Sequence, residues 1–222
     1  MKPYRLLVFD WDGTLMDSQA QIVAVLHTVI DEFGLPPMSA ERIGEVIGLA
    51  LPEAIAGLFP TATASLQRQI VQRYRYHSSH PDSPAASLFP GTEATLAHLR
   101  GMGYVLGVAT SKSRHSLEQE LELTHLRDYF AVTRCADETR SKPDPLMLKE
   151  IMAHLAALPQ ETVVIGDSEY DLGMAHNAGI DAIAVTSGVH HRERLLAWLP
   201  RTCLDSIVEL PHWLDGVLVD HH

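Results

Sequence analysis

Beyond residue 89, short apolar runs alternate along the chain with longer stretches whose apolar residues recur at helical spacing. Together with the run at residues 6–9, these apolar runs predict strands over residues 104–109, 131–135, 162–165 and 182–185. The stretches between them predict helices over residues 92–100, 113–123, 144–158 and 171–178. Apolar strands separated by helices are typical of a parallel sheet buried on both faces. The sequence therefore predicts an α/β fold, with a Rossmann-like parallel sheet and helices on both of its faces.

Residues 18–85 follow a different pattern, because every element predicted there is a helix. Ser18 and Gln21 match a capping box that starts the first helix, and Gly34 ends it. Further helices are predicted over residues 40–47, 52–58 and 64–77. The segment 78–84, rich in Ser and Pro, is typical of a linker. We therefore expect a core domain, residues 1–17 and 86–222, with an inserted all-helical cap domain, residues 18–85.

The composition fits a folded protein and narrows its classes of partner. Of 222 residues, 46% are hydrophobic, and the net charge is −11, so no basic excess exists to bind nucleic acid. No run approaches the roughly 20 apolar residues of a membrane helix, and no secretory signal pattern is seen. Cys135 and Cys203 lack a metal-binding spacing and are expected to be reduced, in a cytoplasmic protein. The sequence leaves the oligomeric state undetermined.

The first predicted strand ends in two carboxylates, Asp10 and Asp12, followed directly by Gly13 and Thr14. Burying a carboxylate without a partner is costly on the scale of the whole stability of a domain. Two such groups at the end of a buried strand therefore indicate a bound cation, with one Asp left to do chemistry. Gly13 allows the backbone to approach a ligand closely.

Other polar residues also follow predicted strands. Thr110 and Ser111 follow one strand, Asp167 follows another with Asp171 four positions on, and Lys142 precedes a helix. The carboxyl ends of parallel strands meet at one edge of a sheet, so we expect these side chains to gather there. Carboxylate oxygens suit Mg²⁺, with Asp10 and Asp167 as the first candidates. Phosphate could be bound by Lys142, the Thr110 hydroxyl, the Ser111 amide and the amides around Asp12 and Gly13.

These segments resemble the motifs of a known enzyme family. Asp10-x-Asp12-Gly13-Thr14, Thr110, Lys142 and Gly166-Asp167-x-x-x-Asp171 are similar to the four motifs of the haloacid dehalogenase-like phosphatases, in the family's order. The helical insert after the first motif resembles the small cap of the subgroup that contains phosphoglycolate phosphatase and β-phosphoglucomutase. The resemblance implies a Mg²⁺-dependent phosphatase that acts on a small phosphorylated metabolite and forms an aspartyl-phosphate intermediate.

The resemblance also implies a role for each residue. Asp10 would attack phosphorus, and Asp12 would protonate the leaving alcohol and then activate water. Thr110 and Lys142 would hold the phosphoryl group, while the cap closes over the site. The implied surroundings of Mg²⁺ are the carboxylates of Asp10 and Asp167 and the backbone carbonyl of Asp12, with Asp171 beside them.

Several alternatives remain open at this point. A phosphomutase of the same family would need cationic cap residues near Gly48, and the sequence shows no cluster of them. A dehalogenase would have no use for Asp12 or Mg²⁺, and a non-catalytic phosphate-binding regulatory protein would not need both aspartates intact. The apolar segment around Gly48 either contacts the substrate or only connects two helices. Lys112 and Arg114 are expected to lie in solvent at the start of a helix.

Overall fold

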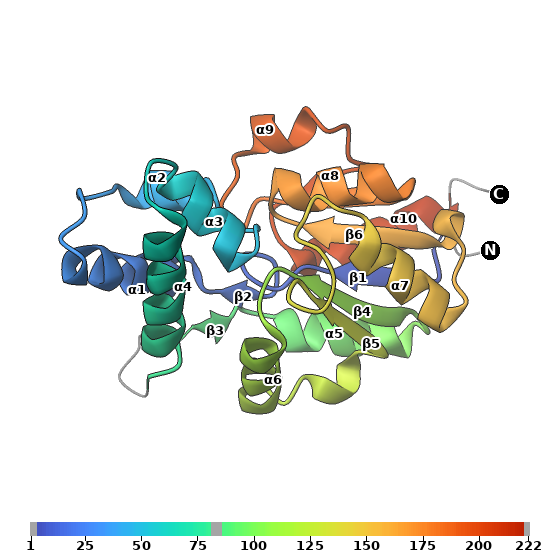
Figure 1. Ribbon diagram of the computed structural model, residues 1–222. Coiled ribbons are helices and arrows are strands. Elements are labelled where there is room, and N and C mark those ends of the chain that lie inside the picture. The colour runs from blue at the N-terminus through green and yellow to red at the C-terminus, as the bar shows by residue number, and fades with distance from the viewer. Residues whose placement is uncertain (1–3, 81–85, 220–222) are drawn as a thin grey trace.

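A computed structural model describes residues 4–80 and 86–219 and contains a six-stranded parallel sheet. The strand order is β5-β4-β1-β6-β7-β8, so β1 lies near the centre between β4 and β6 (Figure 1). The strands are β1 (Leu6–Phe9), β4 (Val105–Thr110), β5 (Val132–Cys135), β6 (Thr162–Gly166), β7 (Asp181–Val185) and β8 (Cys203–Leu204). All adjacent pairs in this sheet are parallel, as the apolar strands predicted.

Alternating side chains of β1 enter two different cores, because successive residues of a strand point to opposite faces. Leu6 and Val8 belong to the apolar cluster under α7 (Leu146–Leu155) and α8 (Glu169–Ala178). Leu7 and Phe9 belong to the cluster on the opposite face. The helices of that face are α5 (Thr92–Gly101), α6 (Arg114–Leu123) and α10 (Leu210–Val219). The predicted fold class, an α/β core with helices on both faces, is confirmed.

Four helices form a separate group beside the sheet and share an apolar cluster of their own (Figure 1). They are α1 (Gln19–Glu32), α2 (Ala40–Gly44), α3 (Leu51–Leu58) and α4 (Ala64–Ser78). The chain leaves the sheet through β2 (Met16–Asp17) and returns through β3 (Ser87–Leu88), which pairs antiparallel with β2. Part of the predicted linker, residues 81–85, lies outside the described residues. The division at residues 18 and 85 stays a prediction.

Some helix boundaries differ from the sequence pattern. The predicted helix 40–47 ends at Gly44, and the predicted helix 144–158 ends at Leu155, where Ala156 adopts a left-handed φ of 48°. Strand β8 has two residues and α9 (Arg192–Leu196) five, which is too short for a recognisable period. Ser18 does precede α1, but its side chain makes no capping hydrogen bond. The predicted capping box is therefore wrong, and the Ser18 hydroxyl has a different partner.

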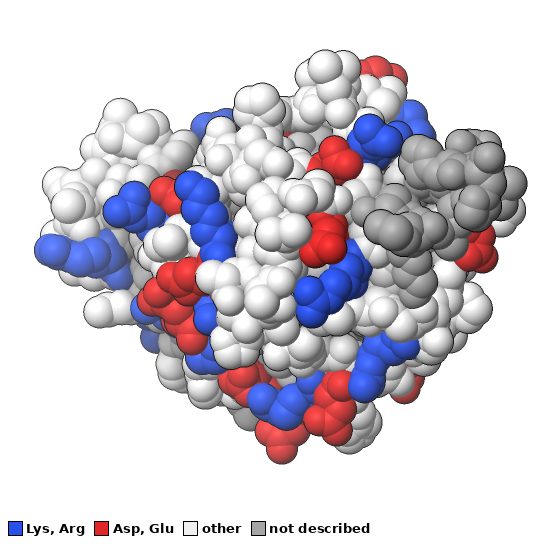
Figure 2. Space-filling view, turned by 90° about the vertical axis from the view of Figure 1, so that its right-hand side faces the viewer, with Lys and Arg blue, Asp and Glu red and all other residues white. Residues whose placement is uncertain are grey.

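Membrane spans, surface charge and cysteines of the described residues bear on the expectations drawn from composition. In residues 4–80 and 86–219, no helix is long and apolar enough to cross a bilayer. Figure 2 shows basic and acidic side chains interspersed over the face at the right of Figure 1. Cys135 and Cys203 are both free thiols.

Candidate active site

Three aspartates gather at the carboxyl edge of the sheet. Asp10 directly follows β1, Asp167 directly follows β6, and Asp171 lies in the first turn of α8. Because β1 and β6 are adjacent and parallel, the two strand ends lie side by side. One carboxylate oxygen of each residue lies within 4.8 Å of the others, and all three side chains are buried. The structure thus brings together three residues that the sequence placed at separate strand ends.

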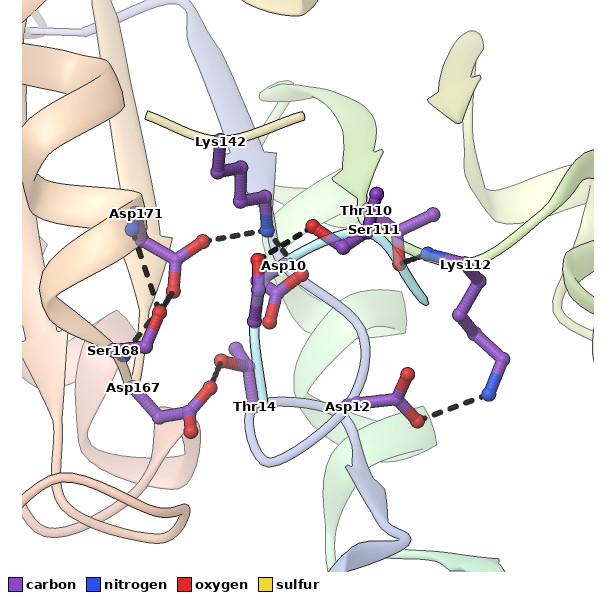
Figure 3. A network of polar contacts seen from close by, with 12 residues as sticks. Asp10, Asp12, Thr14, Thr110, Ser111, Lys112, Lys142, Asp167, Ser168 and Asp171 are labelled. Atoms are coloured by element: carbon purple, nitrogen blue, oxygen red, sulfur yellow. Dashed lines mark hydrogen bonds and ion pairs between the residues drawn. The ribbon is translucent and has the colours of Figure 1, made fainter. Parts of the chain in front are cut away.

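Lys142 joins this group from the segment between β5 and α7 and is itself fully buried. Its Nζ donates to Asp10 Oδ1 at 2.5 Å and to Asp171 Oδ1 at 2.6 Å (Figure 3). Burial alone lowers the pKa of Lys142, but the charges of Asp10 and Asp171 outweigh burial and raise the pKa. The lysine therefore stays charged, and it is a fixed cation at the carboxylate of Asp10.

The carboxylates carry more negative charge than Lys142 can balance. Burial raises the pKa of Asp10 well above its usual range; Asp171 adds to this shift and Lys142 opposes it. Burial and Asp171 raise the pKa of Asp167 to about 7, against hydrogen bonds from the Val189 amide and the Thr14 hydroxyl. A buried set of hard oxygen donors with excess negative charge fits a divalent cation such as Mg²⁺.

Asp171 is more constrained than the other two aspartates. Its Oδ1 accepts from Lys142, and its Oδ2 accepts from the backbone amide of Ser168 at 3.1 Å and from the Ser168 hydroxyl at 2.6 Å. Ser168 and Asp171 form a capping box at the start of α8. With both oxygens occupied, Asp171 is suited to holding Lys142 and the surroundings of a metal. Sequence reasoning missed Ser168, although its place before a helix with Asp three positions on is a capping signal.

The backbone of Gly13 lies very close to the carboxylate of Asp167. Its φ is +83°, and a Cβ atom added there would lie 2.4 Å from Asp167 Oδ2. Its amide donates to the Met16 carbonyl at 2.8 Å, inside the turn that follows β1. Thr14, which follows it, donates its hydroxyl to Asp167 Oδ1 at 2.9 Å. The turn after β1 therefore holds Asp167 in place, a role for Thr14 that the sequence did not indicate.

Thr110 and Ser111 reach the site from the end of β4. Thr110 is buried, and its hydroxyl accepts the backbone amide of Lys112 at 3.2 Å. Ser111 Oγ donates to the carbonyl of Gly48 at 2.5 Å, and a Cβ atom added at Gly48 would lie 2.8 Å from Ser168 Oγ. The segment around Gly48 thus packs against core residues of the site and does more than connect two helices.

Asp12 lies apart from the three other aspartates and pairs with Lys112. Lys112 Nζ lies 3.0 Å from Asp12 Oδ1 and 2.8 Å from Glu120 Oε1, and only 13% of the lysine side chain is exposed. The expectation that Lys112 lies in solvent is wrong, because helical spacing does not show which side of the α6 start faces the site. Arg114 forms a different ion pair, with Glu138 at 2.7 Å.

Comparisons with known proteins agree with this arrangement. A family model for haloacid dehalogenase-like hydrolases matches residues 7–185. A protein named "Probable phosphatase IndB" from Dickeya dadantii is 36% identical over 218 residues, covering 95% of this chain and 92% of the relative. A phosphoglycolate phosphatase from Synechococcus elongatus is 30% identical over 209 residues, covering 93% of each. A solved haloacid dehalogenase-like hydrolase from Bacteroides fragilis has a TM-score of 0.87 at 30% identity, covering 93% of this chain and 99% of that one.

The chain therefore belongs to the haloacid dehalogenase-like hydrolases, which confirms the family inferred from the four motifs. It is an enzyme of this family, and its similarity to the phosphoglycolate phosphatase-like subgroup is confirmed as well. The motif residues lie at one edge of the sheet, where ligands of parallel α/β folds bind.

Proposed function

We propose that the enzyme is a Mg²⁺-dependent phosphatase that hydrolyses a small phosphomonoester, similar to phosphoglycolate, through an aspartyl-phosphate intermediate. The observation that carries this proposal is the pairing of Asp10 Oδ1 with Lys142 Nζ at 2.5 Å in a buried site. Among the described residues, no hydrogen bond reaches the second oxygen of Asp10, which leaves it for attack on phosphorus. Lys142 offers positive charge beside the phosphoryl group as negative charge develops there.

In this proposal the chemistry has two steps. First, Asp10 attacks phosphorus while Asp12 gives a proton to the leaving oxygen. Second, Asp12 takes a proton from water as the water oxygen displaces Asp10 from phosphorus. Thr110 and Lys142 hold the phosphoryl group in both steps, with the amides of Ser111 and the turn after Asp12 supporting them. The cap excludes water during the first step.

The residues suited to hold Mg²⁺ are the carboxylates of Asp10 and Asp167 and the backbone carbonyl of Asp12. Asp171 would support them through Lys142 and Ser168. When bound, Mg²⁺ neutralises charge on the phosphoryl oxygens and on the attacking carboxylate. The raised pKa values of Asp10 and Asp167 support this assignment, because a bound cation would offset the burial and the neighbouring carboxylate charge that raise them.

The substrate proposal draws on the phosphatases among the relatives and on the packing of the cap over the site. We propose a small phosphorylated metabolite as substrate, residues 18–85 as the cap and residues 1–17 with 86–222 as the core. The two free cysteines support a cytoplasmic location.

The phosphomutase alternative has less support. That reaction would need cations of the cap to hold a sugar phosphate near Gly48. Among the described residues, Arg42 instead donates to the Gly57 carbonyl at 3.1 Å, and Arg73 pairs with Glu32 at 2.6 Å, both within the cap. The regulatory alternative is also disfavoured, because both Asp10 and Asp12 are present in a hydrolase family.

Phosphate release from a panel of phosphorylated metabolites tests the proposal. We expect the wild-type enzyme to release inorganic phosphate with Mg²⁺ and to lose this activity in EDTA. Asp10→Asn should abolish turnover and keep the fold, whereas Asp128→Asn, an exposed control, should match the wild type. Activity retained by Asp10→Asn would contradict the mechanism. An isomerised sugar phosphate in place of free phosphate would identify a mutase.

A further inference from the structure

A second polar cluster lies beside Asp12, apart from the carboxylates that face Lys142. Lys112 Nζ donates to Asp12 Oδ1 at 3.0 Å and lies 2.8 Å from Glu120 Oε1. Trp11 Nε1 donates to the other oxygen of Glu120. Figure 3 shows the Asp12 carboxylate directed toward Lys112, on the opposite side of the site from Asp171. The proposed mechanism gives the side chains of Lys112, Glu120 and Trp11 no contact with the metal or the phosphate.

The cluster is a partly buried charge network. Lys112 is 13% exposed and Glu120 is 17% exposed. The ammonium of Lys112 lies 3.0 Å from Asp12 Oδ1 and 2.8 Å from Glu120 Oε1, so two carboxylates compensate its charge within the network. Charges are removed from water in this way only where partners compensate them. A lysine that served solubility alone would lie in solvent, as Lys149 on α7 does.

The two oxygens of Asp12 have different surroundings. Oδ1 accepts a hydrogen bond from Lys112 Nζ at 3.0 Å and one from Ser18 Oγ at 2.6 Å. In residues 4–80 and 86–219, no hydrogen bond reaches Oδ2. One oxygen of Asp12 is therefore anchored by two donors, and the other is left for exchange of protons.

We propose that Lys112 is a positioning residue that, with Ser18, anchors Oδ1 of Asp12 so that Oδ2 exchanges protons in both steps. This inference rests on the proposed phosphatase mechanism. In the first step Asp10 bonds to phosphorus, the bond to the leaving oxygen breaks, and the proton on Oδ2 passes to that oxygen. In the second step the water oxygen bonds to phosphorus, the bond to Asp10 breaks, and a water proton passes to Oδ2.

Glu120 and Trp11 hold Lys112 in its place. Glu120 contacts Lys112 through one oxygen and Trp11 through the other, and Trp11 directly precedes Asp12 in the chain. The contacts therefore close a ring from the Asp12 backbone through the indole, Glu120 and Lys112 back to the Asp12 carboxylate. Burial raises the pKa of Tyr74 on α4, and the charges of Lys112, Asp12 and Glu120 also act on this pKa.

The direct test is Lys112→Met, which keeps a long aliphatic side chain and removes the ammonium group. We expect kcat for an alkyl phosphate to fall about 10- to 100-fold, because proton transfer contributes about 10²- to 10⁴-fold. KM should stay within about threefold, because Thr110 and Lys142 still hold the phosphate. Lys112→Arg, which keeps a donor, should recover part of the loss, and the exposed control Lys149→Met should match the wild type. The proposal would be overturned by an unchanged or increased kcat, including the case in which only KM rises.

A double-mutant cycle shows whether Lys112 acts through Asp12. If it does, adding Lys112→Met to Asp12→Asn should cause little further loss of kcat. A further loss as large as in the wild-type background would contradict the proposal. Thermal unfolding of each variant checks the fold. If Lys112→Met does not fold, Glu120→Gln gives the same comparison, with a smaller expected loss of kcat.

Failure of the proposed function would be seen separately. In that case the wild-type enzyme would release no phosphate from any ester, or Asp10→Asn would remain active, and the inference about Lys112 would fall with it. If the wild-type enzyme is active and Asp10→Asn is not, an unchanged Lys112→Met overturns the positioning role alone.

Discussion

A Cβ atom added at Gly188 would lie 1.9 Å from Oδ2 of Asp167. The segment after β7 therefore approaches this carboxylate at backbone distance, and the adjacent amide of Val189 donates to the same oxygen at 3.0 Å. Gly13 approaches the same oxygen, with a Cβ position 2.4 Å away. Asp167 is thus held between two backbone segments that have no room for a side chain.

Gly188→Ala should displace Asp167 and weaken metal binding. Loss of the groups that orient a metal ligand typically costs about 10- to 100-fold in affinity or activity, so we expect a Mg²⁺ requirement at least about tenfold higher. The measurement is the Mg²⁺ concentration that gives half-maximal phosphate release. Gly101→Ala, at the end of α5 with no atom within 4 Å of the added Cβ, is the matched control. Equal Mg²⁺ requirements for the two variants would contradict the prediction.

The stability of the metal-free enzyme should fall as pH rises toward neutrality. Burial, together with Asp171, raises the pKa of Asp167 to about 7, so the folded state binds this proton more tightly than the unfolded chain does. The stabilising contribution is complete below the unfolded pKa of about 4 and is lost as pH rises through about 7. Burial raises the pKa of Asp10 as well, and this shift acts in the same direction.

The proposed Mg²⁺ should reverse this effect, because a cation binds carboxylates in their deprotonated form. The increase in Tm on adding Mg²⁺ should therefore be larger at pH 8 than at pH 5.5. Thermal unfolding in EDTA and in Mg²⁺ between pH 5.5 and pH 8 measures this increase in Tm. In Asp167→Asn, the increase should depend less on pH. An increase in Tm that is the same at every pH would count against the prediction.

Ser18→Ala and Thr63→Ala should separate a site hydroxyl from a capping hydroxyl. Ser18 Oγ donates to Asp12 Oδ1 at 2.6 Å, whereas the Thr63 side chain accepts the Leu66 amide at 3.2 Å and caps α4. We expect Ser18→Ala to lower kcat by about tenfold, as a lost positioning contact does. Thr63→Ala should lower the free energy of unfolding by about 1 kcal/mol and leave kcat unchanged. Steady-state kinetics measure kcat, and urea unfolding measures the free energy of unfolding, for both variants. Full activity of Ser18→Ala would contradict the prediction.

Arg194→Gln should loosen the contact between α9 and the proposed cap. Arg194 lies on α9 and pairs with Glu45, which directly follows α2, and with Glu169 of α8, each at 2.5 Å. These side chains are partly exposed, so we expect a change in unfolding free energy below about 1 kcal/mol. Closure of the proposed cap over substrate should weaken, which should raise KM about two- to fivefold.

High salt should reproduce part of this rise in KM with the wild-type enzyme, because it screens exposed ion pairs. The matched control is Arg192→Gln on the same helix, which removes an exposed ion pair with Asp205. A KM that rises equally in both variants would show that the contact with Glu45 has no special part in closure.

The periodicity of the chain predicted most of the fold. Strand β1 and helix α4 were predicted within one residue, because apolar spacing depends on local sequence and on the face that each element buries. The β2–β3 ladder was missed, because two-residue strands have no period. Helix α7 ended early at Leu155, since Ala156 takes a left-handed conformation that the residue type does not favour.

The candidate site was predicted in part. Spacing and order placed Asp10, Asp167 and Lys142 together, since parallel strands bring their carboxyl ends to one edge. The surroundings of Asp12 were not predicted. Its contact with Lys112 joins residues that are far apart in the chain, and the direction of a lysine at a helix start depends on the packing of that helix.

By itself, the sequence determined the α/β class of this protein, its membership of the family and the identity of the residues at the strand ends. Those properties follow from local periodicity and from motifs read in order along the chain. Only the tertiary structure decided that Gly188 approaches Asp167 and that Ser18 and Lys112 both bind Asp12. The reason is physical: side-chain hydrogen bonds, ion pairs and close backbone approaches depend on which distant segments meet, and only the folded chain brings those segments together.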